Sequence, residues 1–88
     1  MGIMHRKGRF YMRTEHGEAE LLYEIDKNTM SIFHTFVPDE DRRKGFAERL
    51  AFAAFDFAKR NNLKVKPDCP YIEHFLDMHR EMREHTVK

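Results

Sequence analysis

The sequence predicts an α+β fold with the element order β-β-β-α-β-α. Residues 21–25 and 30–37 show the period of two that is typical of strands, whereas residues 46–58 carry apolar side chains at helical i, i+3 and i+4 spacings. A short β-prone segment, residues 63–66, follows the helix. The 88 residues have room for one domain, which we expect to cover residues 1–88.

Three strands are expected before the helix. Arg9–Thr14 is rich in β-prone residues, and Glu15–Glu18 supplies a glycine-containing hairpin turn. Leu21–Ile25 alternates as a half-buried strand does. Met30–Val37 carries bulky side chains on both faces and is closed by Pro38, which indicates a central strand. Regular alternation places three of its side chains on one face: Ile32, His34 and Phe36.

The first helix is the most clearly defined element of the sequence. Alanine and phenylalanine form its apolar stripe, charged residues occupy the opposite side, and Asn61-Asn62 ends it. Because this helix separates Leu63–Lys66 from the third strand, we expect those two strands to run parallel. A last amphipathic helix is predicted for Tyr71–Arg83. The ends of the chain, His5–Lys7 and His85–Lys88, are expected to be frayed.

Composition and charge exclude several classes of protein. The 16 Lys and Arg residues against 15 Asp and Glu give a net charge of +1, so we expect no binding of nucleic acid through bulk charge. The single cysteine, Cys69, cannot form an internal disulfide, which favours a reducing, cytoplasmic location. No apolar run approaches the ~20 residues that cross a bilayer, so no membrane association is expected. Strand edges on so small a sheet allow a monomer or a weak dimer.

The turn Arg42–Ala47 is the clearest functional signal. Gly45 at the mouth of the helix lets backbone N–H groups approach an anion, and the unpaired donors and dipole of a helix N-terminus favour negative charge there. Three neighbouring cations strengthen this prediction: Arg42, Arg43 and Lys44. The preceding acidic run, Asp39–Asp41, is expected to be a solvated loop that also caps the helix, with attraction of a cationic acceptor as the alternative.

Several short motifs together resemble the small single-domain branch of the GNAT N-acetyltransferases. These motifs are His34-Thr35, Val37-Pro38, Arg42-x-x-Gly45-x-Ala47 and Pro67-x-Cys69-Pro70-Tyr71. The resemblance extends over roughly residues 21–76. The sequence departs from the pattern of this branch at Arg43, where a second glycine is frequent, and in the tail at Met78–Met82.

The resemblance implies that acetyl-CoA is the donor co-substrate. It would lie along the third strand and at the start of the first helix, in a wedge where two parallel strands diverge. A backbone N–H near Phe36 or Val37 would stabilise the negative charge that develops on the carbonyl oxygen. The residues expected to contact coenzyme A are Phe36, Val37, Arg42, Arg43, Lys44, Gly45, Phe46 and Ala47.

Acetyl transfer to an amine requires removal of a proton, because a free alkylamine has a pKa near ~10.4. His34 is the candidate base, since an imidazole titrates near neutral pH; the alternative is a buried histidine held by hydrogen bonds. Cys69 is a candidate nucleophile that would carry the acetyl group, a wall of the acceptor pocket, or a small buried hydrophobe. Tyr71 is a candidate proton donor to the departing sulfur, with simple packing as the alternative. Direct transfer and an acetyl-cysteine intermediate both stay open.

The sequence therefore predicts an acetyl-CoA-dependent N-acetyltransferase whose amine acceptor, a protein or a small molecule, is not identified. The alternative is a coenzyme A-binding or protein-interaction module with little or no turnover, because a chain of 88 residues has few loops to enclose an acceptor. A small α+β RNA binder is disfavoured by the near-neutral charge and the lack of an RNP-like aromatic motif. We expect no metal, since His74 and His79 fall on different faces of the last helix.

Overall fold

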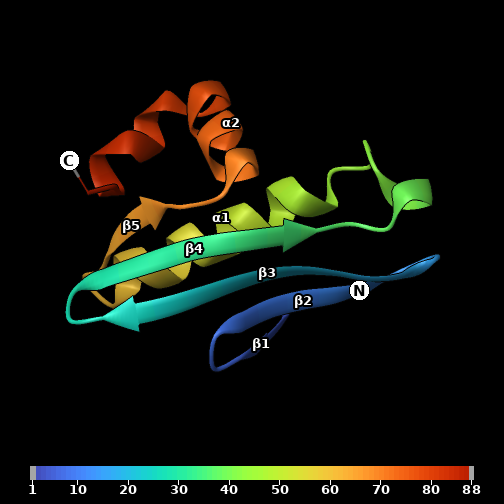
Figure 1. The fold of residues 1–88 in the computed structure, drawn as a ribbon, viewed down its shortest axis with the longest axis horizontal. Helices are drawn as coiled ribbons and strands as arrows, with labels where there is room; N and C mark the ends of the chain where they lie inside the picture. Colours follow the sequence, from blue (N-terminus) through green and yellow to red (C-terminus); the bar gives the residue numbers. More distant parts are fainter. Residues whose placement is uncertain (1, 88) are drawn as a thin grey trace.

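The protein folds as one five-stranded sheet with its helices packed on one face (Figure 1). The computed structural model describes residues 2–87. The strands are β1 (Met4–Arg6), β2 (Arg9–Thr14), β3 (Gly17–Asp26), β4 (Thr29–Phe36) and β5 (Lys64–Pro67). The helices are α1 (Phe46–Arg60) and α2 (Pro70–Met78), with short 3-10 turns η1 (Asp39–Asp41) and η2 (Arg80–His85). None of the helices in residues 2–87 combines the length and apolarity needed to cross a membrane.

The strands lie in the order β1-β2-β3-β4-β5, with antiparallel pairing up to β4 and a parallel β4–β5 pair. The predicted α+β class and the parallel pairing across α1 are both confirmed. The N-terminal segment differs from the prediction, because Met4–Arg6 is not frayed but pairs with β2. β3 is also longer than predicted and begins at Gly17. All three residues of β1 and the first two residues of β3 are exposed, which weakens the apolar alternation that signals a strand.

A bulge in β4 decides which of its side chains face the helices. Leu22 pairs with His34 and Tyr23 pairs with Ile32, so Phe33 is an extra residue on β4. The extra residue reverses the alternation after it: Ile32 is buried in the core, whereas His34 is exposed on the opposite face of the sheet. The expectation that Ile32 and His34 share one face is therefore wrong, because a period-two pattern does not show an inserted residue.

The core lies between the sheet and α1, and α2 packs against α1 and β5 at one end. α1 buries a stripe in which alanines keep the helix close to the sheet. This stripe consists of Leu50, Ala51, Ala54, Phe55 and Ala58. From α2, Phe75 is fully buried and packs against Phe55 with their ring centroids 5.4 Å apart. The other face of the sheet carries mostly polar and charged side chains.

The last helix is shorter than the predicted 71–83, because the chain leaves helical geometry at His79 (φ −129°, ψ 70°) and continues as η2. The imidazole of His79 lies 2.7 Å from Oε2 of Glu48 on α1. Beyond η2 the chain is paired, since the Val87 N–H donates to the Val65 carbonyl at 2.9 Å. The predicted fraying is therefore wrong for residues 86 and 87, and residue 88 lies outside the described residues.

Phe55→Ala should lower the free energy of unfolding by ~3–5 kcal/mol, because it removes a large side chain from a fully packed site. Phe52→Ala on the same helix is the matched control. Phe55 is 0% exposed and Phe52 is 37% exposed, so the control should cost much less. Urea unfolding followed by circular dichroism measures both variants. Equal destabilisation of the two would contradict the described core.

Candidate active site

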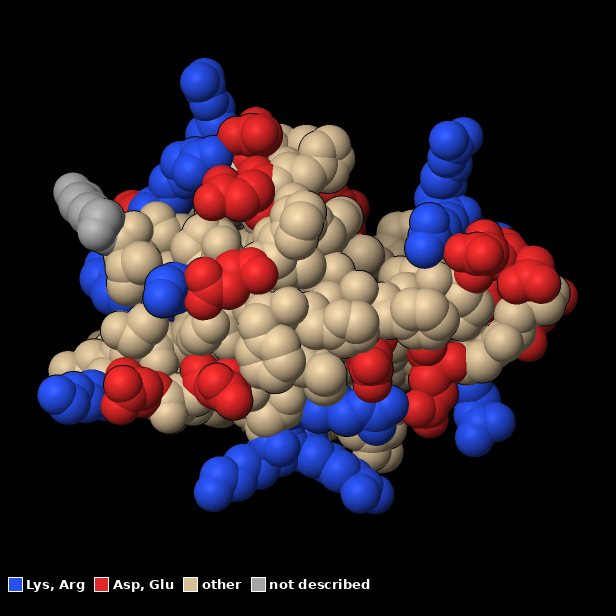
Figure 2. Space-filling model, viewed as in Figure 1, with Lys and Arg blue, Asp and Glu red and all other residues tan. Residues whose placement is uncertain are grey.

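A cleft opens where β4 and β5 diverge. Their parallel ladder ends at the Ile32–Pro67 pair, after which the chain from β5 turns into α2 while β4 continues toward η1 (Figure 1). Figure 2 shows a hollow on this side of the molecule, between α2 and the charged turn that follows η1. The cleft has a volume of about 380 Å³. It is lined by Thr35, Phe36, Val37, Arg42, Ala47 and Tyr71.

The turn from Arg42 to Gly45 leads the chain into the N-terminus of α1. Arg43 and Gly45 have φ angles of 66° and 86°, a region that glycine enters without steric cost. Gly45 is the N-cap of α1, and its carbonyl accepts the Arg49 N–H at 3.0 Å. The N–H groups of the first helical residues precede that bond and have no acceptor within the helix. Together with Arg42 they are donors suited to an anion.

A buried carboxylate holds this turn in place. Asp41 is fully buried and accepts hydrogen bonds from the backbone N–H of His16 at 3.0 Å and from the Lys44 ammonium at 3.1 Å. The backbone N–H of His16 donates to Oδ2 of Asp41, and Nδ1 of the His16 ring lies 3.0 Å from Oδ1. His16 lies in the turn between β2 and β3, so Asp41 joins that hairpin to the turn before α1. The expected solvated, helix-capping loop is therefore wrong for Asp41, and α1 has no side-chain cap.

The charges of this network support one another. Burial would by itself raise the pKa of Asp41, but contacts from Thr14, His16 and Lys44 outweigh it and hold the pKa well below its ordinary value. The hydrogen bond to Asp41 is also the main cause that raises the pKa of His16 and the pKa of Lys44. Asp41 is thus ionised and Lys44 protonated at neutral pH.

The three predicted cations lie in different surroundings. The Lys44 ammonium is 3.1 Å from Asp41 and 3.6 Å from Glu15, so it serves the buried network. Arg42 lines the cleft and pairs with Asp39 at 3.3 Å, with both side chains largely exposed. Because exposed pairs of this kind contribute little stability, Arg42 can reorient toward a bound anion. Arg43 is exposed and lies outside the set of cleft-lining residues.

Tyr71 and Cys69 lie at the start of α2. Tyr71 lines the cleft, and burial, with a further effect of Glu48, raises the pKa of its hydroxyl, which stays protonated at neutral pH and can donate. Cys69 is 6% exposed, and its Sγ lies 3.4 Å from Thr35 Oγ1. This contact crosses the gap between β4 and β5 beyond the end of their ladder. Thr35 belongs to the His34-Thr35 motif, but its contact with Cys69 could not be predicted from the sequence, because the bulge at Phe33 is what turns it inward.

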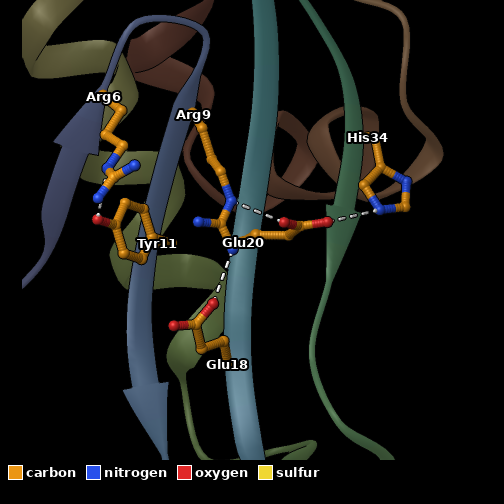
Figure 3. A network of polar contacts seen from close by, with 6 residues as sticks. All are labelled: Arg6, Arg9, Tyr11, Glu18, Glu20 and His34. Carbon is orange, nitrogen blue, oxygen red and sulfur yellow. Dashed lines mark hydrogen bonds and ion pairs between the residues drawn. The ribbon is translucent and has the colours of Figure 1, made fainter.

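His34 lies on the uncovered face of the sheet. Its side chain is 45% exposed, and its Nε2 is 3.5 Å from Oε2 of Glu20 on β3 (Figure 3). The structure thus excludes the alternative of a buried histidine. Phe36, which lines the cleft, follows two residues later on the same face of β4. His34 itself is not among the residues that line the cleft, and the rise of a strand places it roughly 7 Å from Phe36.

The structure brings one set of possible metal-binding side chains together within the described part of the chain: Glu15, His16 and Asp41. The Lys44 ammonium already lies against two carboxylates of this set, at 3.1 Å and 3.6 Å. It supplies the positive charge that these carboxylates require. We therefore interpret the set as an ion-pair network that supports the turn.

Asp41→Asn should lower the melting temperature by roughly 5–10 °C, because the neutral amide cannot replace a charged acceptor shared by His16 and Lys44. Asp39→Asn is the matched control, since the Asp39 side chain is 85% exposed. The control should shift the melting temperature by less than about 2 °C. Thermal unfolding followed by circular dichroism measures both. Similar shifts in the two variants would show that Asp41 does not hold the turn.

The ionisation of His16 should make stability depend on pH. Its pKa is raised in the folded protein, so folding favours the protonated ring. This stabilisation is fully present below the ordinary histidine pKa of about 6.5 and is lost as the pH rises through the folded value. We expect wild type to exceed His16→Gln in stability at about pH 5.5, and the difference to shrink by about pH 9, in urea unfolding. A difference that grows with pH would refute this assignment.

Comparison with known proteins shows the family of this chain. The family model described as GCN5-related N-acetyl-transferase matches residues 9–85. The chain is 44% identical over 62 residues to Protein NATD1 of Xenopus tropicalis and 39% identical over 74 residues to Protein NATD1 of Homo sapiens. These matches cover 69% and 81% of this chain. They cover 57% and 66% of the two relatives, so the chain spans less than two thirds of their length.

A solved structure shares the fold. The NMR solution structure of a GCN5-like protein from Staphylococcus aureus matches with a TM-score of 0.80 at 29% sequence identity. The match covers 98% of this chain and 87% of that protein, so it includes the sheet, both helices and the turn between β4 and α1. From the family match and the shared fold, the chain belongs to the GCN5-related N-acetyltransferases.

Proposed function

We propose that this protein transfers an acetyl group from acetyl-CoA to an amine. The main support is the cleft at the divergence of β4 and β5, where Arg42, Ala47 and Tyr71 lie together. These residues come from the turn before α1, from α1 itself and from the start of α2. A cationic side chain, a helix N-terminus and a protonated phenol are the groups that a charged thioester donor requires.

The pyrophosphate of coenzyme A fits the turn before α1. Its charge suits the unpaired N–H groups of the helix N-terminus and the guanidinium of Arg42. A Cβ built on Gly45 would meet no atom within 4 Å, so the space beside the turn is open. The rest of the donor would follow Phe36 and Val37, along the edge of β4 that β5 leaves after Ile32. Such an edge offers backbone groups to an extended ligand.

His34 and Tyr71 are the residues that we propose to move protons. Acetyl-CoA supplies the acetyl group as a thioester. His34 takes one proton from the acceptor ammonium, and the neutral nitrogen bonds to the acetyl carbon as the carbon–sulfur bond breaks. A second proton leaves the nitrogen and replaces the one that Tyr71 gives to the sulfur. A backbone N–H at Phe36 or Val37 stabilises the charge on the carbonyl oxygen.

The burial of Cys69 supports direct transfer over an acetyl-cysteine intermediate. Its sulfur is in contact with Thr35, and only 6% of the residue is exposed. A nucleophile in this position would have to move before it could attack. The thiol is free, which is compatible with the reducing cytoplasm that we propose as its compartment.

Arg42→Ala should weaken acetyl-CoA binding roughly tenfold, which is the value of one charge-assisted hydrogen bond. Arg43→Ala is the matched control: it removes the same charge from the adjacent position, outside the set of cleft-lining residues. The control should change the affinity no more than about threefold. Isothermal titration calorimetry measures all three proteins. Equal losses in both variants would indicate general charge attraction instead of a site at Arg42.

Turnover with a panel of amines then separates an enzyme from a binding module. Release of the coenzyme A thiol that falls in His34→Ala, with acetyl-CoA binding retained, would support the proposed function. Binding without turnover by wild type would favour the module. An absence of acetyl-CoA binding by wild type would contradict both. Cys69→Ala should keep its activity, and mass spectrometry should find no acetyl group on Cys69 during turnover.

A further inference from the structure

We propose that Glu20 is a positioning residue for His34, holding its imidazole in the tautomer that leaves Nδ1 free to take a proton. The inference deepens the proposed function and rests on it, because a positioned imidazole serves acetyl transfer only if His34 is the base. Its support is a network of side chains on the uncovered face of the sheet, separate from the residues that line the cleft (Figure 3).

Glu20 lies on β3 between partners on the two neighbouring strands. Its Oε1 accepts from Arg9 Nε at 2.9 Å, and its Oε2 lies 3.5 Å from His34 Nε2 (Figure 3). Strand register sets this placement, because Glu20 pairs with Phe36 and Leu22 pairs with His34. Glu20 and His34 are therefore diagonal neighbours on one face, within reach of long side chains. The Glu20 side chain is 25% exposed, which limits screening of this contact by solvent.

Arg9 fixes the orientation of the Glu20 carboxylate. Its guanidinium also donates to Glu18 at 2.8 Å and lies over the ring of Tyr11, 4.1 Å from the ring centroid. The Tyr11 hydroxyl in turn accepts from Arg6 Nε at 3.1 Å. Arg9 is thus restrained by three side chains, which are Glu18, Glu20 and Tyr11. With one oxygen held by Arg9, Glu20 presents the other to His34.

The consequence for His34 follows from the chemistry of imidazole. A carboxylate beside Nε2 favours the tautomer with the proton on that nitrogen. The other ring nitrogen, Nδ1, then keeps its lone pair, and it lies on the side of the ring away from Glu20 (Figure 3). Without the carboxylate, part of the neutral imidazole would carry its proton on Nδ1, and Nδ1 could then not accept a proton from the acceptor ammonium.

Two Glu→Gln variants, which make the same chemical change at different positions, distinguish a positioning role of Glu20 from a contribution to the stability of the sheet. Glu20→Gln and Glu18→Gln each remove a carboxylate from Arg9, but only Glu20→Gln removes the carboxylate beside His34. The first measurement is the ¹⁵N chemical shifts of the His34 ring, recorded above the titration range of histidine. Signals lost in His34→Gln identify that ring. This measurement requires no acetyl-CoA and no turnover.

We expect wild type and Glu18→Gln to show a ring protonated at Nε2, and Glu20→Gln to show a mixture of tautomers. Unchanged ring shifts in Glu20→Gln, or the same change in Glu18→Gln, would overturn the proposal. If wild type lacks turnover, the proposed function fails, while these ring shifts still decide whether Glu20 sets the tautomer.

The second measurement is steady-state acetylation of an amine that wild type accepts. Glu20→Gln should lower kcat roughly tenfold, since it removes part of the contribution of a general base. The KM for acetyl-CoA and the melting temperature should stay unchanged, and Glu18→Gln should keep its kcat. Equal losses of kcat in both variants, or losses that follow the melting temperature, would assign Glu20 a structural role and overturn the proposal.

Discussion

The geometry of the cleft depends on the contacts that the buried, ionised carboxylate of Asp41 makes with His16 and Lys44. A charged group is costly to bury unless hydrogen-bond donors surround it, and here His16 and Lys44 provide them. These partners lie on either side of Asp41 in the sequence, one in the β2–β3 turn and one directly before α1. The turn that follows Asp41 contains Arg43 at a positive φ, a conformation that persists only when the surrounding structure holds it. Asp41 therefore fixes the direction in which α1 begins, and with it the unpaired N–H groups.

The bulge at Phe33 is the second constraint, because it distributes the functional groups of β4 over two faces. Thr35 is turned toward Cys69 and α2, while His34 is turned toward Glu20 on the uncovered face. The end of the β4–β5 ladder opens the sheet at the same level of β4. In the function that we propose, a donor at the N-terminus of α1 and an acceptor beside His34 on the uncovered face would approach each other through the gap between β4 and β5.

The parts of this fold that repeat with a period could be predicted from sequence. The start of α1 after Gly45 and its end near Asn61 are confirmed, because its stripe is long and its boundary residues are distinctive. The bulge could not be predicted, since an inserted residue leaves the composition of β4 unchanged. Asp41 could not be distinguished from its acidic neighbours, because its burial depends on a partner 25 residues away. In the site, Arg42 and Ala47 follow from a motif with fixed spacing, whereas Glu20 depends on the register between strands.

Several residues that we propose for the chemistry lie on regular elements of the fold instead of on loops. Glu20 and His34 are held by the register of β3 and β4, and Tyr71 by the first turn of α2. Groups on strands and helices keep their relative positions more closely than groups on loops. Arg9 on β2 donates to the Glu20 carboxylate and thereby restrains the group that faces His34. The side chains on this face of the sheet thus restrain the carboxylate beside His34, the base that we propose.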